Sequence, residues 1–357
     1  MYKRLLAPII ILFTVSSCVS ACSSPFPLGI ADKIVTSGVN ALVESRSEDG
    51  SIGSYTDTAW AVMGIVASGK NLETISSPSP LGYLERNNDE LLDSFNLTAD
   101  LARNTLAIIA AGKSPFSFGY GNETIPDGNY IEAIKNQHDG YQFGPSESIN
   151  EDFWAVTALI AAGVSADDAI IAKTVEYIIE CQGDDNGWSW AAPCNEWYYA
   201  SDPDNTAAAI IAFANCGYTA DDEPVAKALD YLKSTQGENG GFMSYGIENA
   251  SSTAWTVTAL NALGLDPVTW EVNGNNPVSY LVDLQNPDGS FSFASPMPEG
   301  YLEMAEKTTA DCIIALTGNT YPVTAPHIVK WWLWAVLVIL ITSMIAFLYL
   351  NGKRRMK

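Results

Sequence analysis

The sequence predicts an all-α protein of six stacked helical hairpins, because two patterns recur together along it. The first pattern is an apolar stretch rich in small residues that ends at a glycine. Its copies recur about every 50 residues and end at Gly69, Gly112, Gly163, Gly217, Gly264 and Gly318. Such a stretch is typical of a buried helix whose C-terminal cap is a left-handed glycine. It supplies one helix of each hairpin.

The second pattern precedes each copy and supplies the other helix. Segments 231–242 (YLKSTQGENGGF) and 280–291 (YLVDLQNPDGSF) match at identical spacing, and 177–188 differs by a one-residue shift of the glycine. Weaker copies lie at 41–52, 83–92 and 136–143. Apolar residues at helical spacing run up to the glutamine, and Asp-Gly or Asn-Gly then predicts a turn. Because a single hairpin cannot bury its apolar face, the six units must stack, as a closed ring or as an open solenoid.

The segment 280–291 and its copies resemble the QW repeat of the terpenoid cyclase and protein prenyltransferase superfamily, over nearly all of residues 29–320. The resemblance implies an (α/α)6 toroid. It also implies a structural role for the repeated glutamines and aromatic residues, which tie each outer helix to its neighbour. These residues are Gln182, Trp188, Gln236, Phe242, Gln285 and Phe291.

The two ends of the chain predict export and membrane anchoring. Residues 1–22 have the basic start, apolar stretch and small-residue cleavage site of a signal peptide. Cys22 completes a lipobox-like V-S-A-C, so cleavage, lipidation at Cys22 and an uncleaved helix all remain open. Residues 331–350 are uncharged and long enough for a transmembrane helix, after a linker at 323–330 and before a basic tail at 351–357. We therefore expect a single-pass cell-membrane protein whose toroid, residues 23–322, lies outside the cell.

Charge excludes one class of partner. The chain carries a formal net charge of −23, and six of its 18 lysines and arginines lie in the basic clusters at the two ends. So acidic a surface repels nucleic acid and anionic lipid. We therefore expect no nucleic-acid partner, a membrane contact through the C-terminal helix, and an extracellular ligand or protein that the sequence does not identify.

An extracellular location permits disulfides and glycosylation. Cys181 and Cys194 bracket a short aromatic-rich insertion and form the candidate disulfide, whereas Cys216 and Cys312 lie in apolar helical stretches and are expected as buried thiols. The candidate glycosylation sequons begin at Asn96, Asn122 and Asn249.

The scarcity of histidine argues against two kinds of catalytic site. The chain has only two histidines, His138 and His327. A prenyltransferase zinc site therefore lacks an evident histidine ligand, and a Ser-His-Asp triad lacks an evident histidine base. We expect no cofactor. Calcium at the acidic segments 184–186 and 221–223 is a weaker possibility than solvated turns, because neither has EF-hand spacing.

One motif resembles a catalytic sequence. Residues 202–207 (DPDNTA) are similar to the D-x-D-D-T-A motif of protonating terpenoid cyclases, except that Asn205 replaces the last aspartate. The resemblance implies Asp204 as proton donor, with Asp202 beside it. The alternative is a helix start, in which Asp202 is the N-cap, Pro203 the first helical residue and Asp204 a carboxylate in the first turn. Cyclases of this type also enclose the cavity between two helical domains, and this chain has room for one.

Aromatic residues give the remaining candidates. The insertion at 188–199 either forms a binding lip at one mouth of the ring or packs on itself; its candidate ligand contacts are Trp188, Trp190, Trp197, Tyr198 and Tyr199. Trp60, Trp154 and Trp255 share one phase of the repeat and are expected to pack the ring. Taken together, the sequence predicts a non-catalytic ligand-binding or interaction module. The alternative is a class II terpenoid-cyclase-like isomerase that uses Asp204.

Overall fold

The computed structural model describes residues 26–326 except 76, 93, 193–199 and 302–303. Within these residues, twelve α-helices alternate between an outer and an inner layer. The outer helices are α1 (Lys33–Glu44), α3 (Pro80–Arg86), α5 (Tyr130–Lys135), α7 (Ala169–Glu180), α9 (Glu223–Thr235) and α11 (Pro277–Asp283). The inner helices are α2 (Tyr55–Ala67), α4 (Leu97–Ala110), α6 (Asn150–Ala161), α8 (Pro203–Asn215), α10 (Ala250–Ala262) and α12 (Ala305–Leu316).

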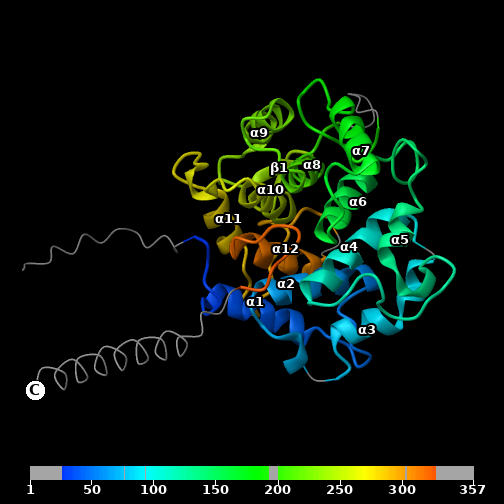
Figure 1. Ribbon diagram of the computed structural model, residues 1–357. Helices are drawn as coiled ribbons and strands as arrows, with labels where there is room; N and C mark the ends of the chain where they lie inside the picture. Colours follow the sequence, from blue (N-terminus) through cyan, green and yellow to red (C-terminus); the bar gives the residue numbers. More distant parts are fainter. Residues whose placement is uncertain (1–25, 76, 93, 193–199, 302–303, 327–357) are drawn as a thin grey trace, which may run out of the picture.

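The inner helices form a closed ring. Each packs against the next inner helix along the chain, and α12 packs against α2. Each of the outer helices α3, α5, α7, α9 and α11 packs against the inner helix that precedes it in the chain, and α1 packs against α12. Figure 1 shows the chain running round the ring until α12 returns beside α1 and α2. The predicted toroid is confirmed at the level of the fold, and the open solenoid is excluded.

Small residues explain how the inner helices approach closely enough to close the ring. At Gly64 of α2, a Cβ atom would lie 2.9 Å from the Cα of Ala310 on α12. The six predicted closing glycines all take left-handed φ values between 68° and 92°, which an L-residue adopts only at a cost. Each inner helix therefore ends where the sequence predicts.

The repeated glutamines join neighbouring outer helices as the resemblance implies. The Gln182 side-chain amide donates to the Pro224 carbonyl at 3.0 Å, and that of Gln236 donates to the Trp270 carbonyl at 2.8 Å. The Gln285 amide donates to the Ile34 carbonyl at 2.8 Å and so links α11 to α1.

The repeated aromatic residues are fully buried, and their backbone N–H groups bond to the following inner helix. The N–H groups of Trp188, Phe242 and Phe291 donate to the hydroxyls of Thr206, Thr253 and Thr309 at 2.9–3.0 Å. The predicted structural role of these residues is therefore confirmed.

Two features were not predicted. A short hairpin of β1 (Phe242–Ser244) and β2 (Ile247–Asn249) precedes α10, with Tyr245 and Gly246 at its turn. Both turn residues have positive φ, 52° and 78°, as a tight hairpin turn requires. Short 3₁₀ turns at Leu72–Thr74, Asn88–Leu91, Pro126–Gly128 and Pro267–Thr269 complete the connections.

Several predictions concern residues outside the described part of the chain. The signal segment 1–22, the membrane helix 331–350 and Cys194 all lie there, so they remain predictions. Within the described residues, no helix is long and apolar enough to cross a membrane. Cys312 is buried as expected, whereas Cys216 is only half-buried at the end of α8.

Candidate functional site: a pocket at one mouth of the ring

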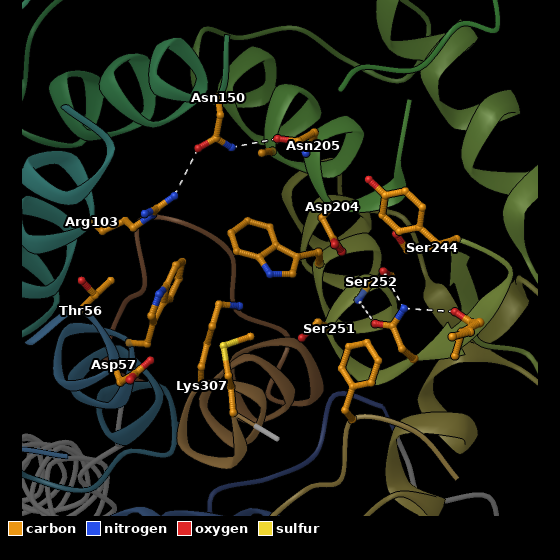
Figure 2. A pocket seen from close by; sticks show the side chains of 18 of the residues that line it. Thr56, Asp57, Arg103, Asn150, Asp204, Asn205, Ser244, Ser251, Ser252 and Lys307 are labelled. Atoms are coloured by element: carbon orange, nitrogen blue, oxygen red, sulfur yellow. Dashed lines mark hydrogen bonds between the residues drawn. The ribbon is translucent and has the colours of Figure 1, made fainter. Parts of the chain in front are cut away.

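A cavity of about 700 Å³ opens where the inner helices begin. Its wall takes residues from the first turns of α2, α6, α8, α10 and α12, and from the β1–β2 hairpin (Figure 2). The lining residues are Thr56, Asp57, Trp60, Arg103, Asn150, Trp154, Asp204, Asn205, Ala208, Ser244, Tyr245, Ile247, Asn249, Ser251, Ser252, Trp255, Phe293, Tyr301, Met304 and Lys307. The size is that of a small-molecule site.

Three tryptophan rings line this pocket, and Tyr321 packs against all three of them. Trp60, Trp154, Trp255 and Tyr321 contact one another with ring centroids 5.2–5.8 Å apart, and each is nearly fully buried. The tryptophans pack the ring as predicted. The same three tryptophans line the pocket, and we refer to them as its floor. Tyr321 follows α12 and has no counterpart in the repeat, so periodicity did not find it.

Two cations lie against the floor. The Arg103 guanidinium is 4.9 Å from the Trp154 ring centroid, and the Lys307 ammonium is 5.1 Å from that of Trp60. Arg103 pairs with Asp100 at 2.9 Å and Lys307 with Asp311 at 2.6 Å. Each cation is therefore compensated by a carboxylate, and it occupies an aromatic face that a ligand would otherwise contact.

Asp204 is a carboxylate of the pocket wall that is neither in an ion pair nor a helix cap. None of the ion pairs among the described residues involves it, and its Oδ1 is buried without a hydrogen-bond partner. Burial, followed by the charge of Asp202, raises its pKa to about 7, against smaller opposing effects of Lys307 and a hydrogen bond with Ser252. A carboxyl group with this pKa is half protonated at neutral pH.

Asp202 has the predicted capping role. It is the N-cap of α8, with Pro203 as the first helical residue, and its Oδ1 accepts a bond from the Asn205 N–H at 2.8 Å. Its Oδ2 accepts a second bond from the Asn205 side-chain amide at 2.8 Å. Both oxygens are engaged, so Asp202 is a structural residue of the helix start.

Asn205, which replaces the last aspartate of the cyclase motif, belongs to a chain of polar side chains along the wall. Its Oδ1 accepts from the Asn150 amide at 2.8 Å, and Arg103 donates to Asn150 at 3.3 Å (Figure 2). This chain fixes Asn205 between Asp202 and Asn150. It leaves Asp204 without a second acid of the kind that the cyclase motif would place at residue 205.

The rim of the pocket carries exposed apolar side chains that the sequence did not single out. Tyr245 is 88% exposed at the hairpin turn, and Ile247, Tyr301 and Met304 are also exposed. Tyr301 stacks on Phe293 with ring centroids 4.1 Å apart. The sequence feature that could have predicted the hairpin is the Tyr245-Gly246 pair, which lies between short apolar runs within residues 242–249.

The described residues of the aromatic insertion, Trp188 and Trp190, do not line this pocket. Trp188 lies in the core, where its indole N–H donates to the Ile178 carbonyl at 2.7 Å, and this corrects its assignment as a ligand contact. Trp190 is exposed but does not line the pocket, and its carbonyl accepts from the Ile149 N–H at 3.0 Å. Trp197, Tyr198 and Tyr199 lie outside the described residues.

The three sequons differ in accessibility. Asn96 is exposed at the start of α4 and makes no capping bond, whereas Asn122 accepts bonds from the Thr124 and Ile125 N–H groups. Asn249 is 1% exposed and caps α10, with its Oδ1 2.8 Å from the Ser252 N–H. A glycan at Asn249 would have to displace that cap, so Asn249 is not an accessible sequon in the folded chain.

The acidic turns use their carboxylates locally. Asp185 accepts from the Ser201 hydroxyl at 2.7 Å, and Asp222 accepts from the Thr219 N–H at 2.7 Å. Over the residues whose structure is described, no three His, Cys, Asp or Glu side chains are grouped so that they could hold a metal ion.

Comparisons with known proteins bear on the fold. The family model of the squalene-hopene cyclase C-terminal domain matches residues 192–319. The solved type II terpene cyclase MstE from Scytonema superposes with a TM-score of 0.53 at 17% identity, covering 80% of this chain and 96% of that one.

The chain has the terpenoid cyclase-like fold. A glycosidase in complex with glucose also superposes on this terpenoid cyclase-like toroid, with a TM-score of 0.53 at 10% identity and coverage of 80% of this chain and 95% of that one. A search of curated proteins found no match. Because similar rings carry different activities at such low identity, the chemistry of this toroid depends on its own pocket.

Proposed function

We propose that this toroid is a non-catalytic binding module whose ligand, a small organic molecule, occupies the pocket at the N-terminal ends of the inner helices. The observation that carries the proposal is the pocket itself: about 700 Å³ with an aromatic floor, polar walls and an exposed apolar rim. Pockets of this size and mixed lining are characteristic of small-molecule sites. The sequence prediction of a membrane-anchored module displayed outside the cell fits this role and is part of the proposal.

The floor argues against carbocation chemistry. A cyclase stabilises positive charge by free aromatic faces, whereas here Arg103 and Lys307 already lie over Trp60, Trp154 and Trp255. A carbocation at the floor would meet two cations. Asn205 is also engaged with Asp202 and Asn150, so it gives Asp204 no acidic partner.

The binding proposal is tested by identifying what the purified chain retains. The full chain is purified in a non-ionic detergent, unfolded in solvent and analysed by mass spectrometry, beside Ser251→Trp. Ser251 is half-buried in the wall and makes no side-chain hydrogen bond among the described residues, so an indole there fills the pocket without removing a contact. We expect a molecule that is retained by the native chain and lost from the variant. The same molecules in both preparations would contradict a ligand in this pocket.

A second candidate function is acid catalysis by Asp204, on the observation that its pKa of about 7 keeps part of the carboxyl protonated in the pocket wall. The test is incubation with linear isoprenoid alkenes and epoxides, with Asp204→Asn as the matched variant. Cyclised product from the native chain alone would establish the enzyme and overturn the non-catalytic proposal.

A further inference from the structure

We infer that the ligand of this pocket is polyhydroxylated, a carbohydrate or a molecule with a sugar-like ring. This inference rests on the proposed binding function and specifies the class of ligand. It is carried by three properties of the wall: cations that are each paired with a carboxylate, hydroxyls without a hydrogen-bond partner among the described residues, and aromatic faces at the rim.

The charges of the pocket leave no cation for an anionic ligand. Arg103 and Lys307 are each paired with a carboxylate within 3 Å, at 2.9 Å and 2.6 Å. Asp57 is held in the capping box of α2, where its Oδ2 accepts from the Ser54 hydroxyl at 2.7 Å. The positive ends of α2 and α8 are offset by the first-turn carboxylates Asp57 and Asp204. A neutral ligand therefore suits the pocket better than a strongly charged one.

The uncharged polar side chains of the wall favour a ligand that both donates and accepts hydrogen bonds. Thr56, Ser244 and Ser251 line the pocket and make no side-chain hydrogen bond among the described residues. Each hydroxyl can donate and accept, and Asp204 adds an acceptor beside Ser252 (Figure 2). A hydrocarbon would desolvate these groups without replacing the hydrogen bonds that they make to water, which is unfavourable. Hydroxyl groups of a ligand would restore them.

The rim offers flat aromatic surfaces on which the C–H face of a sugar ring can pack. Tyr301 and Phe293 stack on each other with an interplanar angle of 16°, and Tyr301 remains 37% exposed. Tyr245, at the hairpin turn, is 88% exposed and also borders the cavity. A pyranose has one face of C–H groups and a periphery of hydroxyls. The first suits a tyrosine ring and the second suits the hydroxyl-bearing wall.

The experiment compares hydroxyl-rich sugar rings with a ring that lacks most of the hydroxyl groups and with an isoprenoid. Methyl glycosides of the common hexoses, pentoses and N-acetylhexosamines, with their di- and trisaccharides, are titrated into the full chain by ligand-observed NMR. Tetrahydropyran-2-methanol serves as the ring without the remaining hydroxyls, and geranylgeraniol as the isoprenoid. We expect at least one glycoside to bind at least tenfold more tightly than the bare ring.

Three variants assign that binding to the pocket. Asp204→Asn keeps the shape but removes the anionic acceptor, and Tyr301→Ala removes the exposed ring; each should weaken glycoside binding about tenfold or more. Glu271→Gln removes one charge from an exposed residue that does not line the pocket and should leave binding unchanged. Circular dichroism of each variant confirms that the helices remain.

The outcomes separate the ligand class from the binding function. Equal affinity for glycosides and the bare ring would overturn hydroxyl recognition while leaving a binding pocket. Binding of geranylgeraniol alone would overturn it in favour of an isoprenoid. If no glycoside binds at about 10 mM, hydroxyl recognition is also overturned. The retained-ligand measurement would then decide the proposed function by itself.

Discussion

Replacing Asp204 with asparagine should stabilise the protein above neutral pH. The pKa of this carboxyl is raised to about 7 in the fold, from 3.8 as its ordinary value. The folded state therefore holds the Asp204 proton more tightly than the unfolded state does. Stability from this group is complete below about pH 4 and is lost as the pH rises through about 7.

The magnitude follows from the shift. Three pKa units correspond to about 4 kcal/mol, since one unit is about 1.4 kcal/mol. Asp204 is half-buried as a whole, and water reaches part of its side chain, so we expect about 2–4 kcal/mol between pH 4 and pH 8.

Urea unfolding of the native chain and Asp204→Asn at pH 4, 6 and 8 measures this contribution. Asp152 is also buried with a raised pKa, but both proteins share it, so its effect cancels in the difference. The charges of Asp202 and Asp311 act on Asp204, so their interaction with it is part of the measured difference. The variant should be the more stable protein at pH 8, and the difference should shrink towards pH 4. A difference that does not depend on pH would refute the account of Asp204 as an uncompensated carboxyl.

Three further predictions test the ring, each by urea unfolding at constant pH. Gly64→Val should cost about 1–3 kcal/mol, because α2 and α12 have no room for a larger side chain, and an unchanged midpoint would contradict the tight closure. Gln285→Ala should cost about 1–3 kcal/mol, since it leaves the Ile34 and Gly289 carbonyls without their donor; a neutral effect would show that water replaces it. Trp255→Ala should cost about 3–5 kcal/mol by emptying the centre of the ring, and a smaller loss would mean that Tyr321 and the other tryptophans collapse into the space.

The repeat made the fold predictable from sequence. Glutamines, closing glycines and buried aromatics occur at fixed spacing because every unit solves the same packing problem. The left-handed Gly264 follows from that spacing, and the Gln285 bond to Ile34 is a tie of the kind that the resemblance to the QW repeat implies. Position within the repeat therefore determined the local structure of most of the ring.

The pocket was less accessible to sequence analysis because it is made by residues that the repeat does not relate. Arg103 lies in the middle of α4 and Lys307 in the first turn of α12, and either alone resembles a solvated basic residue. Tyr301 and the Tyr245 turn lie in connections without periodic signal. Only closure of the ring brings these groups together. Asp204 was identified because it belongs to a motif, but its unpaired state depends on neighbours from other units.

The bond between Gln285 and Ile34 also has a consequence for how the chain is made. These residues are 251 positions apart, yet they join adjacent helices. During synthesis at roughly 5–20 residues per second, α1 must wait on the order of 10–50 s for α11 to appear. Through that interval the apolar faces of α1 and α2 that will meet α12 have no partner, so the nascent chain depends on being kept from aggregation until its last repeat is complete. A ribosome stalled before residue 305 would hold an open ring.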